Sequence, residues 1–360
     1  MWKPDIFLHP AEFKPTRGAV NGGASSSPAQ HCAYCAGEPV IYNPYSSQHL
    51  CEKHFCEGVE RRFKLTIRTH KMLSKNDHIG IALSGGKDSS VMLHLFRMLS
   101  KSLPLKLTAI TIDEGIKGYR PHTLAVAKKE AKRLRVPLIV SSFEKEYGFS
   151  LDRAVAVSKK AALPCSFCGV FRRHLLNRAA KKAGVKKLAI GHNLDDMAQT
   201  FLMNVFRNDT AHISRMMAFE GAPANRGFVP RIRPLMDIPE KEIALYSVLK
   251  GIPIHFQQCP YATTALRQKV RDMLNSFEDS QPGTKIRVAK SALEISRLLP
   301  AASAASLREC KECGEPSSSE YCMACRMVEG LREKTGRAKH AGIGKSEKMG
   351  KAPKARQRKK

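Results

Sequence analysis

The sequence lacks long apolar runs and is poor in acidic residues. None of its apolar stretches reaches the roughly 18 residues that a membrane-spanning helix needs, and the N-terminus has no hydrophobic signal core. Asp and Glu total 32 against 61 Lys and Arg, for a formal net charge of +29. We therefore expect a cytoplasmic protein with a polyanionic partner, although a solvated basic surface or a nuclear import signal would give the same charge.

Eleven cysteines are present. In a reducing compartment cysteines serve as metal ligands or catalytic groups more often than as disulfides. Here they form three groups, at residues 32–56, 165–259 and 310–325. The function of the chain is therefore expected to involve thiol or metal chemistry.

Between the outer cysteine groups, short β-branched runs alternate with helical stretches. The runs that we expect to be strands lie at 79–83, 107–112, 138–140 and 188–190, with a possible fifth at 252–256. This alternation predicts an α/β fold in which helices cover both faces of a Rossmann-like parallel sheet.

A glycine-rich loop follows the first expected strand and precedes a helical stretch. Its residues are Ser84, Gly85, Gly86, Lys87, Asp88 and Ser89. The glycines let backbone N–H groups approach phosphate oxygens, and the helix N-terminus adds free donors and partial positive charge. Lys87 can pair with phosphate, and Asp88 can hold Mg²⁺. The spacing differs from that of a kinase-type P-loop, and a plain tight turn is the alternative interpretation.

These six residues match the signature SGGKDS, so the loop resembles that of the PP-loop ATP pyrophosphatases. The resemblance implies that ATP is split between its α and β phosphates and that AMP is attached to a carbonyl oxygen. A second segment, GHNLDD at 191–196, follows the expected strand at 188–190, where it would complete a nucleotide pocket. The same segment could be a helix cap with acids in the first turn, and both interpretations can hold together.

A lone CxxC motif, Cys165 and Cys168, lies inside the expected core, and Cys259 follows much later. Three thiolates without an obvious fourth ligand, here called the cysteine trio, suggest an incomplete coordination shell. A [4Fe–4S] cluster held in this way keeps one iron open to an exogenous ligand. Two alternatives stay open: a redox pair that carries a persulfide, and structural zinc or buried free thiols.

The segments PCSFCGVFRR, GHNLDD and DEGIKGYR, with Cys259-Pro260, resemble the TtcA/TtuA group of tRNA thiolases, most closely its eukaryotic cytoplasmic 2-thiolation branch. The resemblance implies an iron–sulfur site at the cysteine trio, with catalysis by the trio together with Asp88 and Asp196. It implies ATP contacts from Ala82, Leu83, Ser84, Gly85, Gly86, Lys87, Asp88, Ser89, Ile112, Gly191 and Asp196. Arg172, where relatives often have Lys, is expected to contact a phosphate or the substrate and not to act as a general acid, because arginine stays protonated.

Two four-ligand clusters flank this core with the spacing of structural zinc sites. The C-terminal cluster is Cys310, Cys313, Cys322 and Cys325, and the N-terminal cluster is Cys32, Cys35, Cys51 and His54. Cys56 could exchange with His54 as a ligand, but the family pattern places Cys-x2-His here. The clusters would either shape the tRNA surface or only staple two small subdomains.

The chain is therefore expected to have five parts: a disordered extension at 1–30, a zinc finger at 31–60, a PP-loop catalytic domain at 61–300, a zinc ribbon at 301–330 and a disordered basic tail at 331–360. The leading hypothesis is a tRNA 2-thiolase of the wobble uridine that uses ATP, Mg²⁺, two Zn²⁺ and a [4Fe–4S] cluster. The resemblance also implies a ubiquitin-like sulfur carrier with a C-terminal thiocarboxylate, and a second thiolation subunit or a homodimer.

Two rival hypotheses are a zinc-ribbon nucleic-acid-binding module with a vestigial nucleotide fold, and thiolation of a cytidine. The intact loop and the acidic pair Asp195 and Asp196 argue against the first. The outer cysteine clusters argue against the second, because the cytidine enzymes of the group lack them.

Overall fold

A computed structural model describes residues 31–158, 164–216, 227–255, 257–262, 266–299 and 307–335. The expected extension at 1–30 and most of the expected tail lie outside these ranges. Within the described ranges, no helix is both long enough and apolar enough to cross a membrane.

A five-stranded sheet with the order β5-β4-β3-β6-β7 forms the centre of the molecule. Its strands are β3 (His78–Ala82), β4 (Lys106–Asp113), β5 (Leu138–Ser142), β6 (Lys187–Ala189) and β7 (Arg231–Ile232). All four strand pairings are parallel, which confirms the expected α/β fold. The order of the strands reverses between β3 and β6, and a doubly wound sheet binds its ligands beyond the carboxyl ends of the strands at such a point.

The expected fifth strand at 252–256 is wrong. Residues 252–255 are irregular, Phe256 lies outside the described ranges, and the fifth strand is β7. The apolar pattern was misleading because Ile252 packs into the core without pairing to a strand. β7 has only two residues and no apolar run, so no periodicity marks it.

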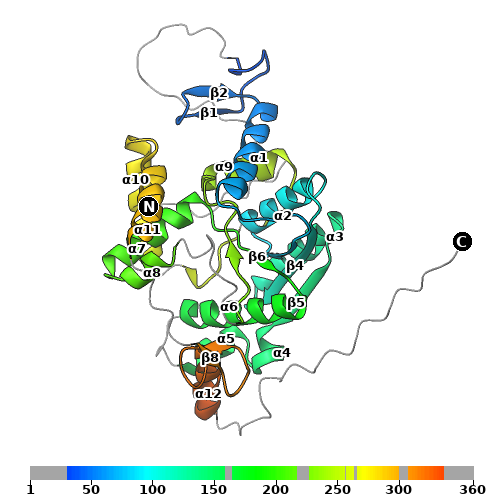
Figure 1. Ribbon diagram of the computed structural model, residues 1–360, viewed down its shortest axis with the longest axis vertical. Coiled ribbons are helices and arrows are strands. Elements are labelled where there is room, and N and C mark those ends of the chain that lie inside the picture. Colours follow the sequence, from blue (N-terminus) through cyan, green and yellow to red (C-terminus); the bar gives the residue numbers. More distant parts are fainter. Residues whose placement is uncertain are drawn as a thin grey trace, which may run out of the picture.

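Helices cover both faces of the sheet and form two main cores. On one face, Ile79 and Ile81 pack with α1 (Glu52–Thr69), α2 (Lys87–Leu99), α3 (Arg120–Arg133) and α9 (Glu240–Leu249). On the other, Ile110 and Ile112 pack with α4 (Phe143–Tyr147), α5 (Leu151–Ser158), α6 (Pro164–Lys182) and α12 (Met323–Thr335). A lateral group comprises α7 (Leu194–Phe206), α8 (Thr210–Ser214), α10 (Leu266–Ser280) and α11 (Thr284–Leu298), as Figure 1 shows.

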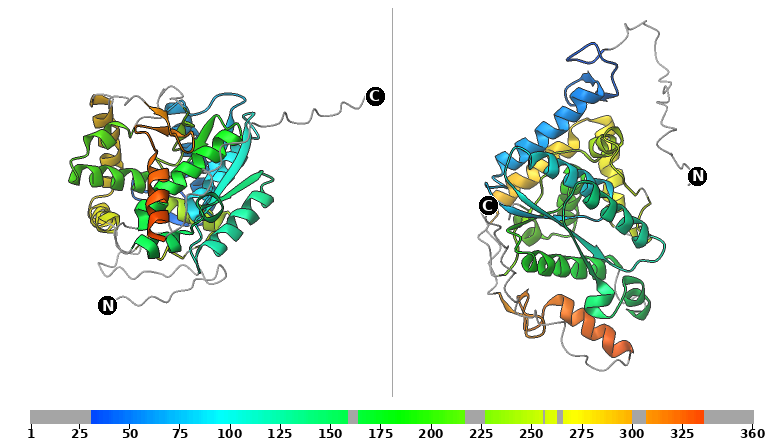
Figure 2. Two further views of the ribbon diagram at one scale, coloured as in Figure 1. Left: turned by 90° about the horizontal axis from the view of Figure 1, so that it is seen from below. Right: turned by 90° about the vertical axis from the view of Figure 1, so that its right-hand side faces the viewer.

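The two outer cysteine clusters lie at opposite ends of the molecule, as the views in Figures 1 and 2 agree. The N-terminal end is the hairpin of β1 (Ile41–Asn43) and β2 (Gln48–Leu50), and the C-terminal end is the hairpin of β8 (Arg308–Glu309) and β9 (Pro316–Ser317) followed by α12. Helix α12 runs to Thr335 and buries Leu331, so the expectation of a disordered tail from Leu331 is wrong for its first five residues. The sequence did not predict that the helix extends to Thr335, because a single buried leucine among charged residues shows no helical period.

Candidate active site

The glycine-rich loop joins β3 to α2 at the carboxyl edge of the sheet. Gly85 has φ +88°, and a Cβ atom there would lie 2.0 Å from the carbonyl oxygen of Thr123. The Ser84 and Ser89 hydroxyls lie 3.0 Å apart, and the Ser89 hydroxyl accepts a hydrogen bond from the Ser84 N–H at 3.1 Å. Gly86 caps α2 with extended backbone and no side chain. The loop therefore presents a tightly fixed backbone and a free helix N-terminus, which suits a phosphate.

The charged side chains of the loop form a network with residues from elsewhere in the fold. Lys87 Nζ lies 3.0 Å from Asp88 and 2.7 Å from Glu240, at the start of α9. The other oxygen of Asp88 accepts a hydrogen bond of 2.8 Å from the side-chain amide of Asn193. Burial raises the pKa of Asp88, against the opposing effect of Lys87, and burial also raises the pKa of Asp196. Two carboxylates held in this way can bind a divalent cation, which would lower both pKa values.

The GHNLDD segment caps a helix, as one interpretation of its sequence predicted, and it also lies against the glycine-rich loop. Asn193 and Asp196 form a capping box at the start of α7, with hydrogen bonds of 3.2 and 2.9 Å. A Cβ on Gly191 would lie 3.3 Å from the Ser89 backbone nitrogen, so this segment packs directly on the nucleotide loop. Asp195 points elsewhere and forms a buried ion pair of 2.5 Å with Lys285. Asp196 is therefore the acid of this pair that remains near the loop.

The remaining expected ATP contacts lie at the same edge. Ala82 ends β3, and Ile112 lies near the end of β4. The Leu83 and Ile112 side chains are buried, and the Leu83 N–H donates to the Ile110 carbonyl at 2.8 Å. Any contact of Leu83 and Ile112 with a nucleotide would therefore come from backbone atoms.

The sequence analysis missed three charged residues of this site. Glu240 binds Lys87, Arg271 lies 3.3 Å from Glu240, and Arg267 lies 3.5 Å from Asp196. All three come from helices far along the chain, and a single charged residue on a helix carries no spacing signal. Only the fold could have assigned them to the loop.

The cysteine trio gathers beside this edge. Helix α6 begins at Pro164, so Cys165 and Cys168 lie in its first turns. The Cys165 thiol lies 3.7 Å from the Tyr261 carbonyl, two residues beyond Cys259. Burial raises the pKa of both Cys168 and Cys259, and neighbouring thiols of the trio add to the effect. The charge of Cys165 raises the pKa of Cys259, and the charge of Cys259 raises the pKa of Cys168. The three cysteines therefore lie in one neighbourhood, but their sulfurs are not all within 4.8 Å of one another as the ligand atoms of each outer cluster are. Cys259 follows an irregular segment and not the expected strand.

The surroundings of the trio suit an iron–sulfur cluster. Burial raises the pKa of Cys168 to about 11, while the Arg172 guanidinium, which donates to its sulfur at 3.1 Å, lowers it. Of the remaining cysteines, seven belong to the outer clusters, and Cys56 is buried in the core with its pKa raised by burial to about 11. The trio therefore has no fourth cysteine and has a cation beside it. In a [4Fe–4S] cluster each thiolate binds a different iron, so three thiolates would leave one iron open.

Arginines add positive charge at the end of β7. Arg231 and Arg233 flank Ile232, and burial lowers the pKa of both, that of Arg233 to about 10, with Arg231 adding to the effect on Arg233. The neighbouring Arg173 on α6 also lowers the pKa of Arg231. Adjacent guanidiniums that disfavour one another's charge are stabilised by phosphate, so this edge suits a polyanion.

The outer clusters each bring four ligand atoms within 4.8 Å of one another. In the N-terminal cluster, His54 Nδ1 lies 3.3 Å from both Cys32 and Cys51 and 3.5 Å from Cys35. In the C-terminal cluster, the sulfurs of Cys310 and Cys325 lie 3.7 Å apart, as do those of Cys313 and Cys322. The geometry therefore gathers His54 and not Cys56, and both clusters suit a tetrahedral metal.

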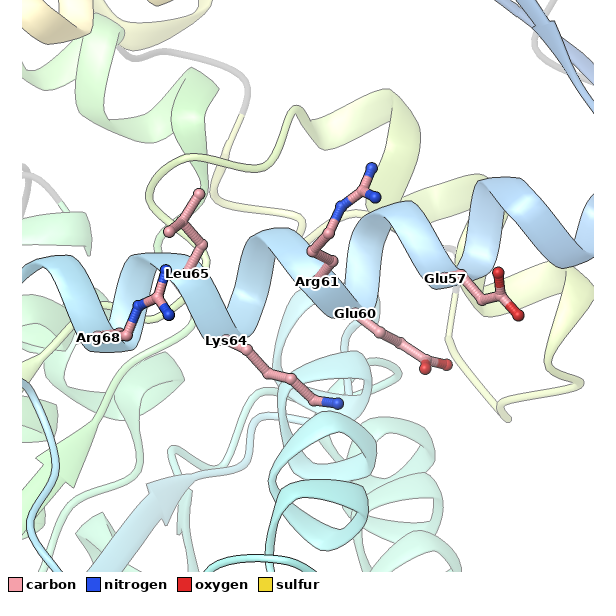
Figure 3. A pocket seen from close by; sticks show the side chains of 6 residues that line it. All are labelled: Glu57, Glu60, Arg61, Lys64, Leu65 and Arg68. Atoms are coloured by element: carbon pink, nitrogen blue, oxygen red, sulfur yellow. The ribbon is translucent and has the colours of Figure 1, made fainter. Parts of the chain in front are cut away.

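A pocket of about 600 Å³ follows α1, and Figure 3 shows its lining side chains, Glu57, Glu60, Arg61, Lys64, Leu65 and Arg68. A second pocket of about 320 Å³ lies between α1, α7 and α11. Neither pocket is lined by the glycine loop or the cysteine trio among the described residues. The glycine loop and the cysteine trio are therefore separate from the two cavities along α1.

Comparisons with known proteins agree with this geometry. Residues 57–276 match the PP-loop domain family. The chain is 35% identical to the tRNA 2-thiolation protein NcsA of Haloferax volcanii, over 83% of this chain and 98% of that protein. It is 34% identical to the cytoplasmic tRNA 2-thiolation protein 1 of Bos taurus, over 84% and 88% respectively. Its fold matches the U34-tRNA thiolase NcsA of Methanococcus maripaludis, solved with its [4Fe–4S] cluster, at a TM-score of 0.73 and 32% identity, over 84% of this chain and 96% of that one.

Proposed function

The chain belongs to the PP-loop family of tRNA 2-thiolation proteins, and we propose that it replaces the O2 oxygen of the wobble uridine of tRNA with sulfur at the expense of ATP. The observation that carries this proposal is the shared sheet edge. The glycine loop with Asp88, and the segment with Asp196, follow the neighbouring strands β3 and β6 at their carboxyl ends. Arg172, which donates to Cys168 of the trio, is linked to the same loop through Glu114 and Arg120, and this supports one shared site.

The first step is adenylation of the base. The uridine O2 attacks the α phosphorus of ATP, the bond to the β phosphate breaks, and pyrophosphate leaves. The loop backbone and the N-terminus of α2 hold the phosphates, Lys87 neutralises their charge, and Asp88 with Asp196 would hold Mg²⁺. Arg231 and Arg233 are suited to grip the tRNA backbone.

The second step is sulfur transfer. Sulfur attacks C2 of the activated base, the bond between C2 and the AMP oxygen breaks, and AMP leaves. A [4Fe–4S] cluster on Cys165, Cys168 and Cys259 would supply an iron free of protein ligands at which sulfide can bind. Arg172 places a fixed positive charge at Cys168, where it balances thiolate charge. The alternative is a persulfide on Cys165 or Cys168, loaded by a donor of sulfane sulfur. Its outer sulfur would attack C2 as AMP leaves, and the other thiol of the pair would then release the 2-thiouridine by forming the Cys165–Cys168 disulfide.

The remaining parts have supporting roles. We assign one zinc ion to Cys32, Cys35, Cys51 and His54, and another to Cys310, Cys313, Cys322 and Cys325. The eukaryotic relative's name supports a cytoplasmic location. Sulfur is proposed to come from a ubiquitin-like carrier with a C-terminal thiocarboxylate, and the partner is a second thiolation subunit or a second copy of this chain.

The test is an anaerobic assay of the reconstituted full chain with unmodified tRNA, ATP and sulfide. We expect pyrophosphate release that depends on tRNA, one AMP per thiolated base, and 2-thiouridine at the wobble position. Pyrophosphate without thiolation would point to adenylation for another purpose. A chain that binds tRNA but releases no pyrophosphate would instead support the rival hypothesis of a nucleic-acid-binding module.

A further inference from the structure

A continuous chain of charged groups joins the nucleotide loop to the cysteine trio. Arg120, at the start of α3, donates from Nη1 to the Ser84 carbonyl at 2.7 Å. Its Nε lies 2.9 Å from one carboxylate oxygen of Glu114, and the other oxygen lies 2.8 Å from Arg172. Arg172 in turn donates to the Cys168 sulfur at 3.1 Å. Three side chains therefore connect a loop carbonyl to a thiol of the trio.

The centre of this chain is buried, whereas its far end is partly exposed. The side chains of Arg120 and Glu114 are only 3% and 4% exposed, whereas that of Arg172 is 45% exposed. Arg120 is held further by hydrogen bonds to the Thr111 and Thr123 hydroxyls. A buried carboxylate between two guanidiniums interacts strongly with both, because little water screens the charges. Arg172 therefore depends on Glu114 for its position more than on its own packing.

We propose that Glu114 is a positioning residue that holds Arg172 on Cys168 and ties it to the ATP loop, so that nucleotide binding and cluster retention influence each other. This inference rests on the proposed function of the trio. A nucleotide that fixes the Ser84 carbonyl fixes Arg120, and Glu114 passes this restraint to Arg172. Because such coupling is reciprocal, the group on the cysteines must change the affinity for ATP by the same factor.

The experiment measures this coupling directly in the reconstituted full chain. Iron loss to bathophenanthroline is followed with and without Mg²⁺ and α,β-methylene ATP, which cannot be cleaved at the α–β bond. Affinity for the same analogue is measured in cluster-loaded and cluster-free protein. In the wild-type chain we expect the analogue to change the rate of iron loss, and the cluster to change the affinity for the analogue, each by at least about fivefold. In Glu114→Gln, the ratio of the two rates and the ratio of the two affinities should both be close to one.

A matched control is Glu146→Gln. Glu146, on α4, also binds an arginine of α6, with 3.1 Å to Arg178, but it is not one of the three side chains that join the loop to Cys168. The control should keep the wild-type ratios, because it weakens an ion pair on the same helix without touching the chain of charges. If Glu114→Gln fails to fold, Arg172→Met breaks only the exposed end and should likewise abolish the coupling.

The inference is overturned if the wild-type chain thiolates tRNA but shows no coupling, or if Glu114→Gln and Arg172→Met both keep it. Equal loss of coupling in Glu146→Gln would also overturn it, because the effect would then be a general loosening of α6. A wild-type chain that takes up no iron refutes the cluster on the trio, and this inference with it. A wild-type chain that forms no 2-thiouridine refutes the proposed function itself.

Discussion

The carbonyl oxygen of Thr123 occupies the position that a side chain on Gly85 would need, since a Cβ there would lie 2.0 Å away. We predict that Gly85→Ala weakens ATP binding by more than about tenfold, because positive φ and this clash both force the loop to move. The control is Gly118→Ala, which has φ +70° but no atom within 4 Å of its Cβ. Calorimetric titration with the uncleavable analogue checks both, and equal losses would place the effect in backbone strain alone.

The Gly85 contact also shows where sequence reasoning stopped. The loop and its six residues were recognisable because a local motif lay between a strand and a helix. The neighbours that fix its shape were not, because Thr123 and Glu240 meet the loop only through the topology of the sheet. Similarly, DEGIKGYR was recognised as a family segment, but only the fold shows that Glu114 and Arg120 bridge two sites. The short strand β7 was missed because the irregular residues at 252–254, of which Ile252 is buried, carried the stronger apolar signal.

The second prediction concerns Asp88 and Asp196. Burial raises the pKa of Asp88, and the charge of Asp196 raises it further. Because a raised pKa means that protonation begins at a higher pH, Mg²⁺-dependent ATP binding should weaken on acidification earlier than exposed aspartates would allow. Asp196→Asn should lower the pKa of Asp88, so the acid limb of the plot of ATP affinity against pH, where affinity falls on acidification, should move to lower pH. The overall affinity should also be weaker. Titrations of affinity against pH measure the limb, and an unchanged limb would contradict the assignment.

A third prediction separates Asp88 from tRNA binding. Asp88→Ala removes the proposed Mg²⁺ ligand and the partner of Asn193, so tRNA-dependent pyrophosphate release should be abolished. The tRNA affinity should stay close to that of the wild type, because the proposed phosphate contacts at Arg231 and Arg233 are untouched. Full release in this variant would refute the PP-loop assignment.

The fourth prediction tests the cysteine trio against a buried cysteine. Cys259→Ala should lose iron and thiolation together but keep tRNA-dependent pyrophosphate release, because the proposed adenylation groups lie on the glycine loop. Cys56→Ala is the control, since Cys56 is only 1% exposed, lies in the core and is not among the four residues that the N-terminal cluster gathers. It should keep iron and activity at a modest cost in stability. Wild-type thiolation by an iron-free Cys259→Ala chain would favour the persulfide route instead.

The last prediction concerns the contact between the nucleotide-binding body and the C-terminal cluster. His174 Nε2 on α6 lies 3.4 Å from the Cys313 sulfur, and its Nδ1 lies 2.7 Å from the Tyr147 hydroxyl. One turn further along α6, Asn177 and then Lys181 bind Glu315 of the ribbon. The ribbon is therefore docked on the helix that begins with Cys165 and Cys168, and losing its metal should loosen that helix.

Cys310→Ser should release about one equivalent of zinc and raise hydrogen exchange in residues 307–335 and in α6, because thiolate binding stabilises small metal sites. His174→Ala should raise exchange in α6 but keep the zinc, since all four thiolates remain and an outer partner only orients a ligand. Zinc content is measured by mass spectrometry alongside exchange. Unchanged zinc in Cys310→Ser would refute the metal assignment. Zinc loss in His174→Ala would make the histidine a ligand, and unchanged α6 exchange in both variants would show that the ribbon does not support the helix.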